Sequence, residues 1–158
     1  MLAATCLLAC APQLNWRDVE LGSLHTLLPC KPDTGSRVVV LGAQVVHMDM
    51  AGCEVGGALF AISRVRANDP AQAASLLVLL RQASLANIGN PVVHPLANSG
   101  DAFTSFDIQV DGHGTDGTPL QVRLKWLLAG QDIFQLAVYA KALAVEQTEN
   151  LITQAHIR

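Results

Sequence analysis

Three stretches in the C-terminal half of the chain alternate between apolar and polar residues. They cover residues 106–110, 120–126 and 134–141. In a β-strand, successive side chains point to opposite faces of the sheet, so an alternating sequence has one apolar and one polar face. The stretches are joined by short segments that contain Gly and Asp. The pattern therefore predicts an antiparallel meander of three strands.

The N-terminal half also reads as strands, of which the first two, 15–21 and 24–28, are weakly patterned. A turn cluster at 31–36 precedes a hairpin whose strands, 37–41 and 44–50, are joined at Gly42 and Ala43. A further strand is predicted over 57–66. Turn residues of this kind separate short β-strands in many antiparallel sheets.

Two helices are predicted. The first begins at Asn68 or Asp69 as N-cap with Pro70 at the first helical position, and Gly89 ends it. An irregular loop with two prolines, 89–101, is expected to follow. The second helix is predicted over 145–157, with one stripe made of Thr148, Leu151, Ile152 and Ala155.

Strands in blocks with few helices indicate an α+β fold rather than alternating parallel units. We expect an antiparallel sheet of about six to seven strands packed with two helices, an α/β/α-type sandwich. A chain of 158 residues fits one domain, predicted over 10–158.

Composition narrows the possible partners. Hydrophobic residues make up 51% of the chain, charged residues 15% and aromatic residues 4%, so we expect an aliphatic core. The net charge is -3 and Lys and Arg do not cluster, which argues against nucleic acid as a partner. No apolar run reaches the length of a membrane-spanning helix.

The N-terminus is interpreted as a processing signal. Residues 1–9 resemble the remnant of a signal peptide that ends in a bacterial lipobox, Leu7-Leu8-Ala9-Cys10, although no basic residue precedes it. Cys10 would then carry a lipid that anchors the chain to a membrane. Ala11, rather than Asp, resembles the signal for the outer membrane. The alternative is an apolar tail that contains a cysteine.

The remaining cysteines, apart from Cys6 in the signal, are Cys30 and Cys53. The predicted hairpin returns to its starting end, so these two residues are expected at the same end of the sheet. An oxidising periplasm would join them in a disulfide. Two buried free thiols or a metal-binding pair are the alternatives.

The segment 110–120 contains the spacing G-x-G-x-x-G at Gly112, Gly114 and Gly117. A dinucleotide site needs a helix after these glycines, but a strand is predicted after Pro119, so no nucleotide is expected. The oxygen-bearing side chains of this segment also lack the spacing that a calcium-binding loop requires. We predict a hairpin tip in which the glycines adopt positive φ.

Metal binding is considered for two groups of residues. In 47–53, His, Met and Cys suit a soft metal, but strand alternation separates Met48 and Met50 from His47 and Asp49. The second group is Asp111, His113 and Asp116, which could bind a metal weakly but are also ordinary turn residues. No metal and no cofactor is expected.

Recognition is assigned to the loops. Asn90 and His94 in the proline-containing loop, together with Asp111, His113 and Asp116, are the candidate recognition residues. The common hydrolase, zinc-protease and phosphate-loop motifs are missing from the sequence.

Three segments resemble the PsbP-like superfamily of helix–sheet–helix sandwiches. They are LLPCKPD (27–33), ALFAIS (58–63) before the helix that starts at Asp69-Pro70, and IFQLAVYA (133–140) before the terminal helix. The resemblance covers residues 14–158. It implies a binding or assembly scaffold, as in bacterial lipoproteins of this superfamily, rather than an enzyme.

The favoured hypothesis is therefore a lipid-anchored periplasmic binding or assembly module without catalysis, which contacts the membrane through its anchor and binds a protein partner. One alternative is a periplasmic enzyme or metal-binding protein that uses His94 or His113 with nearby Asp. Another is a carrier of a small ligand, held between helix and sheet.

Overall fold

The structure is a computed structural model that describes residues 14–97 and 105–158. Its elements, in chain order, are β1 (Arg17–Leu21), β2 (Leu24–Leu28), β3 (Asp33–Leu41), β4 (Gln44–Val55), β5 (Ala58–Arg66), η1 (Pro70–Gln72), α1 (Ala73–Ala86), β6 (Gly89–Pro95), β7 (Ser105–His113), β8 (Pro119–Ala129), β9 (Asp132–Ala140), α2 (Val145–Thr153) and β10 (His156–Ile157). The predicted α+β class is confirmed. The hairpin at Gly42 and the C-terminal meander are also confirmed.

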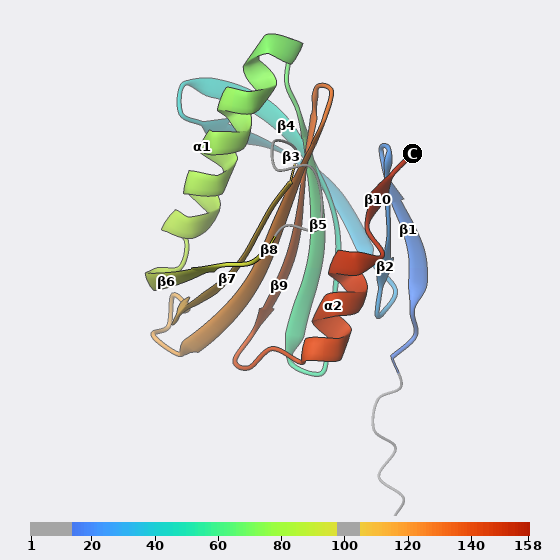
Figure 1. Cartoon of the computed structure of the whole chain (residues 1–158), viewed down its shortest axis with the longest axis vertical. Helices are drawn as coiled ribbons and strands as arrows, with labels where there is room; N and C mark the ends of the chain where they lie inside the picture. The colour runs from blue at the N-terminus through green and yellow to red at the C-terminus, as the bar shows by residue number, and fades with distance from the viewer. Residues whose placement is uncertain (1–13, 98–104) are drawn as a thin grey trace, which may run out of the picture.

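A seven-stranded antiparallel sheet forms the centre of the fold. Its strand order is β3-β4-β5-β9-β8-β7-β6, and a second sheet has the order β1-β2-β10. Figure 1 shows α1 on one face of the large sheet, with α2 and the small sheet on the other. The layers are those of the predicted sandwich, with a small sheet added beside α2.

Each face of the large sheet has its own apolar core. On the α1 face, Leu76 and Leu80 pack with side chains such as Trp126 of β8. On the α2 face, Leu151 packs with side chains such as Phe60 of β5. Alternate residues of a strand supply the two cores, as the period of two requires.

The first helix starts as predicted. Asp69 accepts a hydrogen bond from the backbone N–H of Ala71, and Pro70 opens the short η1 turn that leads into α1. The helix ends at Ala86, three residues before Gly89.

The predicted loop over 89–101 is wrong in its first half, because residues 89–95 form the edge strand β6, paired with β7. Proline is tolerated in an edge strand, where one row of backbone N–H groups has no partner strand. An irregularity in the pairing between Gly89 and Val92 accommodates Asn90, whose φ is 47°.

The predicted hairpin tip is shorter than expected. Gly112 and His113 belong to β7, and of the three glycines only Gly117 has a positive φ. Gly112 is needed for close approach instead, since a Cβ there would lie 2.8 Å from the carbonyl oxygen of Gly89 in β6. The neighbouring strand, missed by the sequence pattern, explains this glycine.

The second helix is also shorter than predicted. It ends at Thr153, and His156 and Ile157 form β10, which pairs with β2. The free edge of β2 provides hydrogen-bond partners for this segment. Pairing within the fold therefore overrides the helical continuation.

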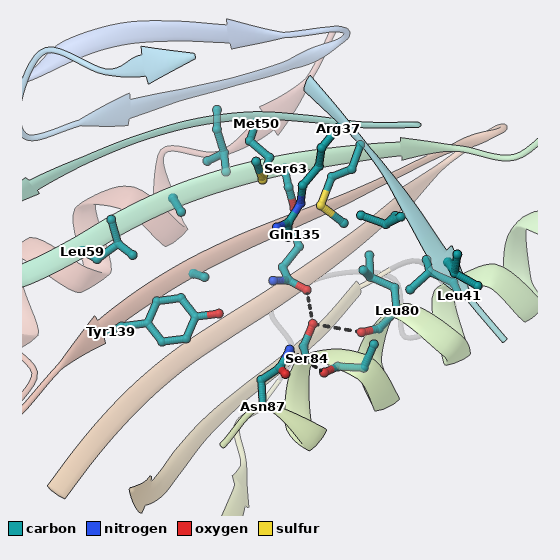
Figure 2. Close-up of a pocket in the computed structure, with 17 residues that line it drawn as sticks. Arg37, Leu41, Met50, Leu59, Ser63, Leu80, Ser84, Asn87, Gln135 and Tyr139 are labelled. Atoms are coloured by element: carbon teal, nitrogen blue, oxygen red, sulfur yellow. Dashed lines mark hydrogen bonds between the residues drawn. The ribbon is translucent and has the colours of Figure 1, made fainter. Parts of the chain in front are cut away.

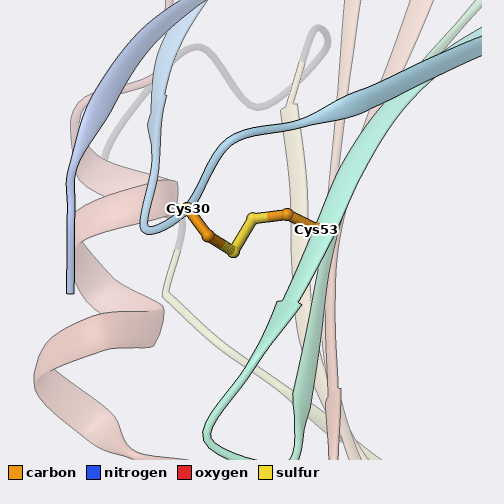
Figure 3. Close-up of a disulfide and its surroundings, with 2 residues drawn as sticks. All are labelled: Cys30 and Cys53. Atoms are coloured by element: carbon orange, nitrogen blue, oxygen red, sulfur yellow. A yellow bond between two sulfur atoms is a disulfide. The ribbon is translucent and has the colours of Figure 1, made fainter. Parts of the chain in front are cut away.

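A disulfide joins Cys30 to Cys53, with the two Cα atoms 5.9 Å apart (Figure 3). It links the segment before β3 to the second half of β4, as the hairpin geometry predicted. The sequence separation is 23 residues. Closing a loop of this length stabilises a fold by about 3 kcal/mol in the chain-entropy model.

Candidate ligand-binding cavity

A cavity of about 450 Å³ lies between the large sheet and α1 (Figure 2). Residues of four strands and one helix line it: Arg37, Val39, Val40 and Leu41 of β3; Met48 and Met50 of β4; Leu59, Ala61, Ile62 and Ser63 of β5; Gln135, Ala137 and Tyr139 of β9; and Leu80, Ala83, Ser84 and Asn87 at or near the C-terminal half of α1.

The cavity exists because small side chains occupy its floor. Ala61 of β5 pairs with Ala137 of β9 on one side and with Gly52 of β4 on the other. Ser63, two residues along β5, adds another short side chain. Helix α1 packs mainly against β3, β8 and β9, and it leaves space above Ala61 and Ser63 of β5.

Longer apolar side chains form the walls. Met48, Met50 and Leu59 rise from the sheet, while Leu80 and Ala83 face the cavity from α1. Methionine side chains are flexible and polarizable, and they adapt to ligands of different shapes. The walls are therefore suited to an apolar molecule.

A hydrogen-bond network fixes one polar group at the cavity. Trp126 donates from Nε1 to Oε1 of Gln135 at 2.7 Å, and Ser84 donates from Oγ to the same oxygen at 2.6 Å or to the carbonyl of Leu80 at 2.9 Å. Because an indole nitrogen only donates, the oxygen of the Gln135 amide must face Trp126. The orientation of the amide is thus determined.

Some of the other polar groups of the cavity have no hydrogen-bond partner among the described residues. These include the hydroxyls of Ser63 and Tyr139. Figure 2 shows the Tyr139 hydroxyl directed across the cavity toward Ser84 and Gln135. Burial raises the pKa of the Tyr139 phenol, so this hydroxyl stays protonated at neutral pH.

The structure separates the residues of the segment 47–53 as strand alternation predicted. Met48 and Met50 face the cavity, whereas His47 and Asp49 lie on the opposite face of β4. Imidazole and thioethers therefore do not converge. The two methionines form part of the cavity wall.

The predicted recognition residues lie on β6, on β7 and in the turn after β7, near the sheet edge opposite β3, and none of the five lines the cavity. His94 contacts Asp111, with 2.9 Å between Nε2 and Oδ2, and Gln121 donates to the other oxygen of Asp111 at 3.0 Å. His94 and Asp111 are about half exposed. The structure thus brings together two of the five.

The other predicted residues do not join this pair. Asp116 accepts hydrogen bonds from the hydroxyl and backbone N–H of Thr118, which lower its pKa. His113 ends β7, and Asn90 lies in β6. No three His, Cys, Asp or Glu side chains could hold a metal within residues 14–97 and 105–158. Cys10, predicted to carry lipid, lies outside the described residues.

Sequence reasoning missed every residue of the cavity as a site residue. One signal was present: Ala61 and Ser63, and then Ala137, are small residues at alternate positions of otherwise bulky strands. Small residues on one face of a strand leave room for a ligand, but only pairing of β5 with β9 shows that they are adjacent.

The fold and the cavity define an α+β sandwich with an apolar pocket between a helix and a sheet. Compared with protein-family models the chain matches none, and no curated protein sequence is significantly similar to it. None of the helices in the described ranges has the length and apolar character needed to span a membrane.

Proposed function

We propose that the protein is a non-catalytic binding module of the bacterial envelope whose cavity holds a small apolar ligand. The observation that carries this proposal is the cavity of about 450 Å³ on the α1 face. Pockets that bind small molecules are concave and mostly apolar, contain a few fixed polar groups and have volumes of roughly 300–1,000 Å³. The cavity has all these properties.

The surrounding structure supports binding without a large rearrangement. The floor lies in the interior strands β5 and β9 of a continuous sheet, and the Gln135 amide is fixed by Trp126 and Ser84. A preformed site loses little conformational entropy when the ligand enters. Met48 and Met50 supply the flexibility that the sheet lacks.

A cavity-filling substitution tests the binding function. Ala83→Phe is expected to weaken binding of a neutral naphthylamine fluorophore, which brightens in apolar surroundings, by at least about tenfold, a loss of about 1.4 kcal/mol. The phenyl ring would occupy the space above Ala61 and Ala137. The measurement is a fluorescence titration of the purified full chain.

The matched control is Ala86→Phe. Ala86 lies on the same helix, is exposed and does not line the cavity, so this variant adds an equal apolar surface elsewhere. It should bind the fluorophore like the unchanged chain. Failure of the unchanged chain to bind, or equal loss in both variants, would contradict the proposed function.

Anchoring in the outer membrane is the second part of the proposal. It is supported by the lipobox resemblance at Cys10 and by the disulfide, which is typical of proteins from oxidising compartments. The PsbP-like resemblance also favours a binding or assembly role, with a protein partner that receives or delivers the ligand.

Cys10→Ala is expected to move the chain from the membrane fraction to the soluble periplasmic fraction, because no lipid can then be attached. Fractionation followed by immunoblotting measures the distribution. Cys6→Ala, which changes a cysteine of the signal itself, should leave the chain with the membranes. An unchanged distribution of the Cys10→Ala variant would refute the anchor.

A further inference from the structure

We infer that the ligand of the α1 cavity is a long-chain monocarboxylate, a fatty-acid-like molecule whose carboxylate lies beside Arg37. This inference rests on the proposed function and specifies the chemistry of its ligand. Three properties of the cavity lead to it: a single charge, an excess of hydrogen-bond donors and an apolar remainder.

The only charged side chain among the residues that line the cavity is Arg37 of β3. Arg37 makes no ion pair or hydrogen bond with any described residue. The nearest strand offers no compensation, because Asp49 of β4 lies on the other face and contacts Ser36 and Arg64. One unpaired guanidinium complements one negative charge, and its planar fork suits a carboxylate.

Arg37 can reach the cavity because the positions beside it are open. Its partner across β4 is Met48, and Gly35, two residues earlier in β3, pairs with Met50 and has no atoms near the place of a side chain. Figure 2 shows Arg37 extending from β3 in the direction of Ser63 and Gln135.

The neutral polar groups of the cavity add donors. The oxygen of the Gln135 amide is occupied by Trp126 and Ser84, so the amide nitrogen carries two N–H donors with no described acceptor. The hydroxyls of Ser63 and Tyr139 can donate as well. Carboxylate oxygens only accept, and together they accept about four hydrogen bonds.

The rest of the lining is aliphatic or thioether. Apart from Asn87, whose side chain donates to the carbonyl of Ala83 at the end of α1, the remaining residues are Val, Leu, Ile, Ala and Met. Such a surface favours an alkyl chain, because each methylene that enters the cavity removes apolar surface from water. A cationic amphiphile would place its charge against Arg37 and is disfavoured.

The test compares three amphiphiles that differ in head group and have chains of nearly equal length: laurate, lauryl alcohol and lauryltrimethylammonium. Each is titrated calorimetrically into the purified full chain, the two ionic amphiphiles below their critical micelle concentrations and the alcohol below its solubility limit. We expect laurate to bind about tenfold more tightly than the alcohol, and the cationic amphiphile more weakly than both. Added salt should reduce the affinity for laurate and leave that for the alcohol unchanged.

Arg37→Gln should remove the preference for laurate over the alcohol without lowering the affinity for the alcohol. Arg17→Gln, at an exposed position of β1 outside the cavity, is the matched control and should keep the preference. Tyr139→Phe keeps the aromatic ring but lacks the hydroxyl, and should lower the affinity for laurate by roughly threefold to tenfold.

The outcomes separate this inference from the proposed function. Equal affinities for laurate and the alcohol, or a preference for laurate that survives Arg37→Gln, would overturn the inference that the ligand is a monocarboxylate. Binding of the alcohol would in that case still support a site for apolar ligands. Tighter binding of the cationic amphiphile would also overturn the inference. If none of the three binds, the proposed function fails as well.

Discussion

Trp126→Ala is expected to lower the free energy of unfolding by about 3 to 5 kcal/mol. Trp126 of β8 is completely buried in the core of the α1 face. Truncation would remove its packing and leave a cavity that the surrounding strands fill only in part. The guanidinium of Arg81 lies 5.5 Å from its ring and 4.0 Å from that of Phe106, so a cation–π contact is lost as well.

The loss can be measured by denaturant unfolding followed by circular dichroism. Trp16→Ala is the matched control, because Trp16, the other tryptophan of the chain, is only partly buried and lies outside both cores. It should cost less than about 1 kcal/mol. Equal destabilisation by the two substitutions would show that Trp126 is not a principal part of the core.

Trp126→Phe separates packing from hydrogen bonding. It retains most of the apolar contacts but removes the N–H that holds the Gln135 oxygen, so the amide can rotate. We expect a smaller loss of stability, about 1 kcal/mol, together with weaker discrimination between laurate and the alcohol. Trp126 therefore acts as a positioning residue for the proposed carboxylate site.

The sequence pattern predicted the elements in which local and tertiary preferences agree. Strict alternation in 120–126 and 134–140 corresponds to β8 and β9, interior strands whose two faces are both covered. Asp69 and Pro70 marked the start of the first helix because a cap acts through its own neighbours. The pairing of the two disulfide cysteines could be predicted because the second strand of a hairpin returns to the end where the first strand begins.

The sequence pattern did not predict the elements that depend on pairing with a strand distant in the sequence. Among the described residues, β6 pairs with β7 alone and β10 with β2 alone. The two prolines of β6 and the two-residue length of β10 leave neither strand with a local sequence signal. Gly112 was assigned to a turn because its real reason, close contact with Gly89, depends on the unpredicted strand.

The cavity was unpredictable for the same physical reason. It requires β5 and β9, more than 60 residues apart in sequence, to be paired so that Ala61 lies beside Ala137. It also requires α1 to cross the sheet without filling the space above β5. Periodicity indicates which residues share a face of one strand, but not which strands are neighbours.

The two faces of the large sheet differ in structure. The α1 face is hollow over β5 and β9, where the ligand is proposed to bind. The α2 face contains two partly buried ion pairs over β7 and β8, in which Arg123 contacts both Asp107 and Glu149. Changes on the α2 face should affect stability without reaching the ligand.

Arg123→Ala is expected to destabilise the fold by about 3 to 5 kcal/mol, because it leaves a charge without its partner. Arg123 donates from Nε and Nη2 to the two oxygens of Asp107, at 2.7 and 2.8 Å, and both side chains are only 10% exposed. Burial alone would lower the pKa of Arg123, but the hydrogen bonds and charges of Asp107 and Glu149 raise it above its usual value. The guanidinium is therefore charged at neutral pH.

The double variant Arg123→Met with Asp107→Leu tests whether the cost comes from the unpaired carboxylate or from lost packing. Replacing both partners by apolar side chains should restore most of the lost stability, because no charge then remains buried. Chemical denaturation of the two variants gives the comparison. If the double variant is as unstable as Arg123→Ala, the cost lies in packing, and the unpaired-charge explanation is refuted. In either case the affinity of the folded double variant for the fluorophore should be unchanged, because Arg123 points away from the α1 cavity.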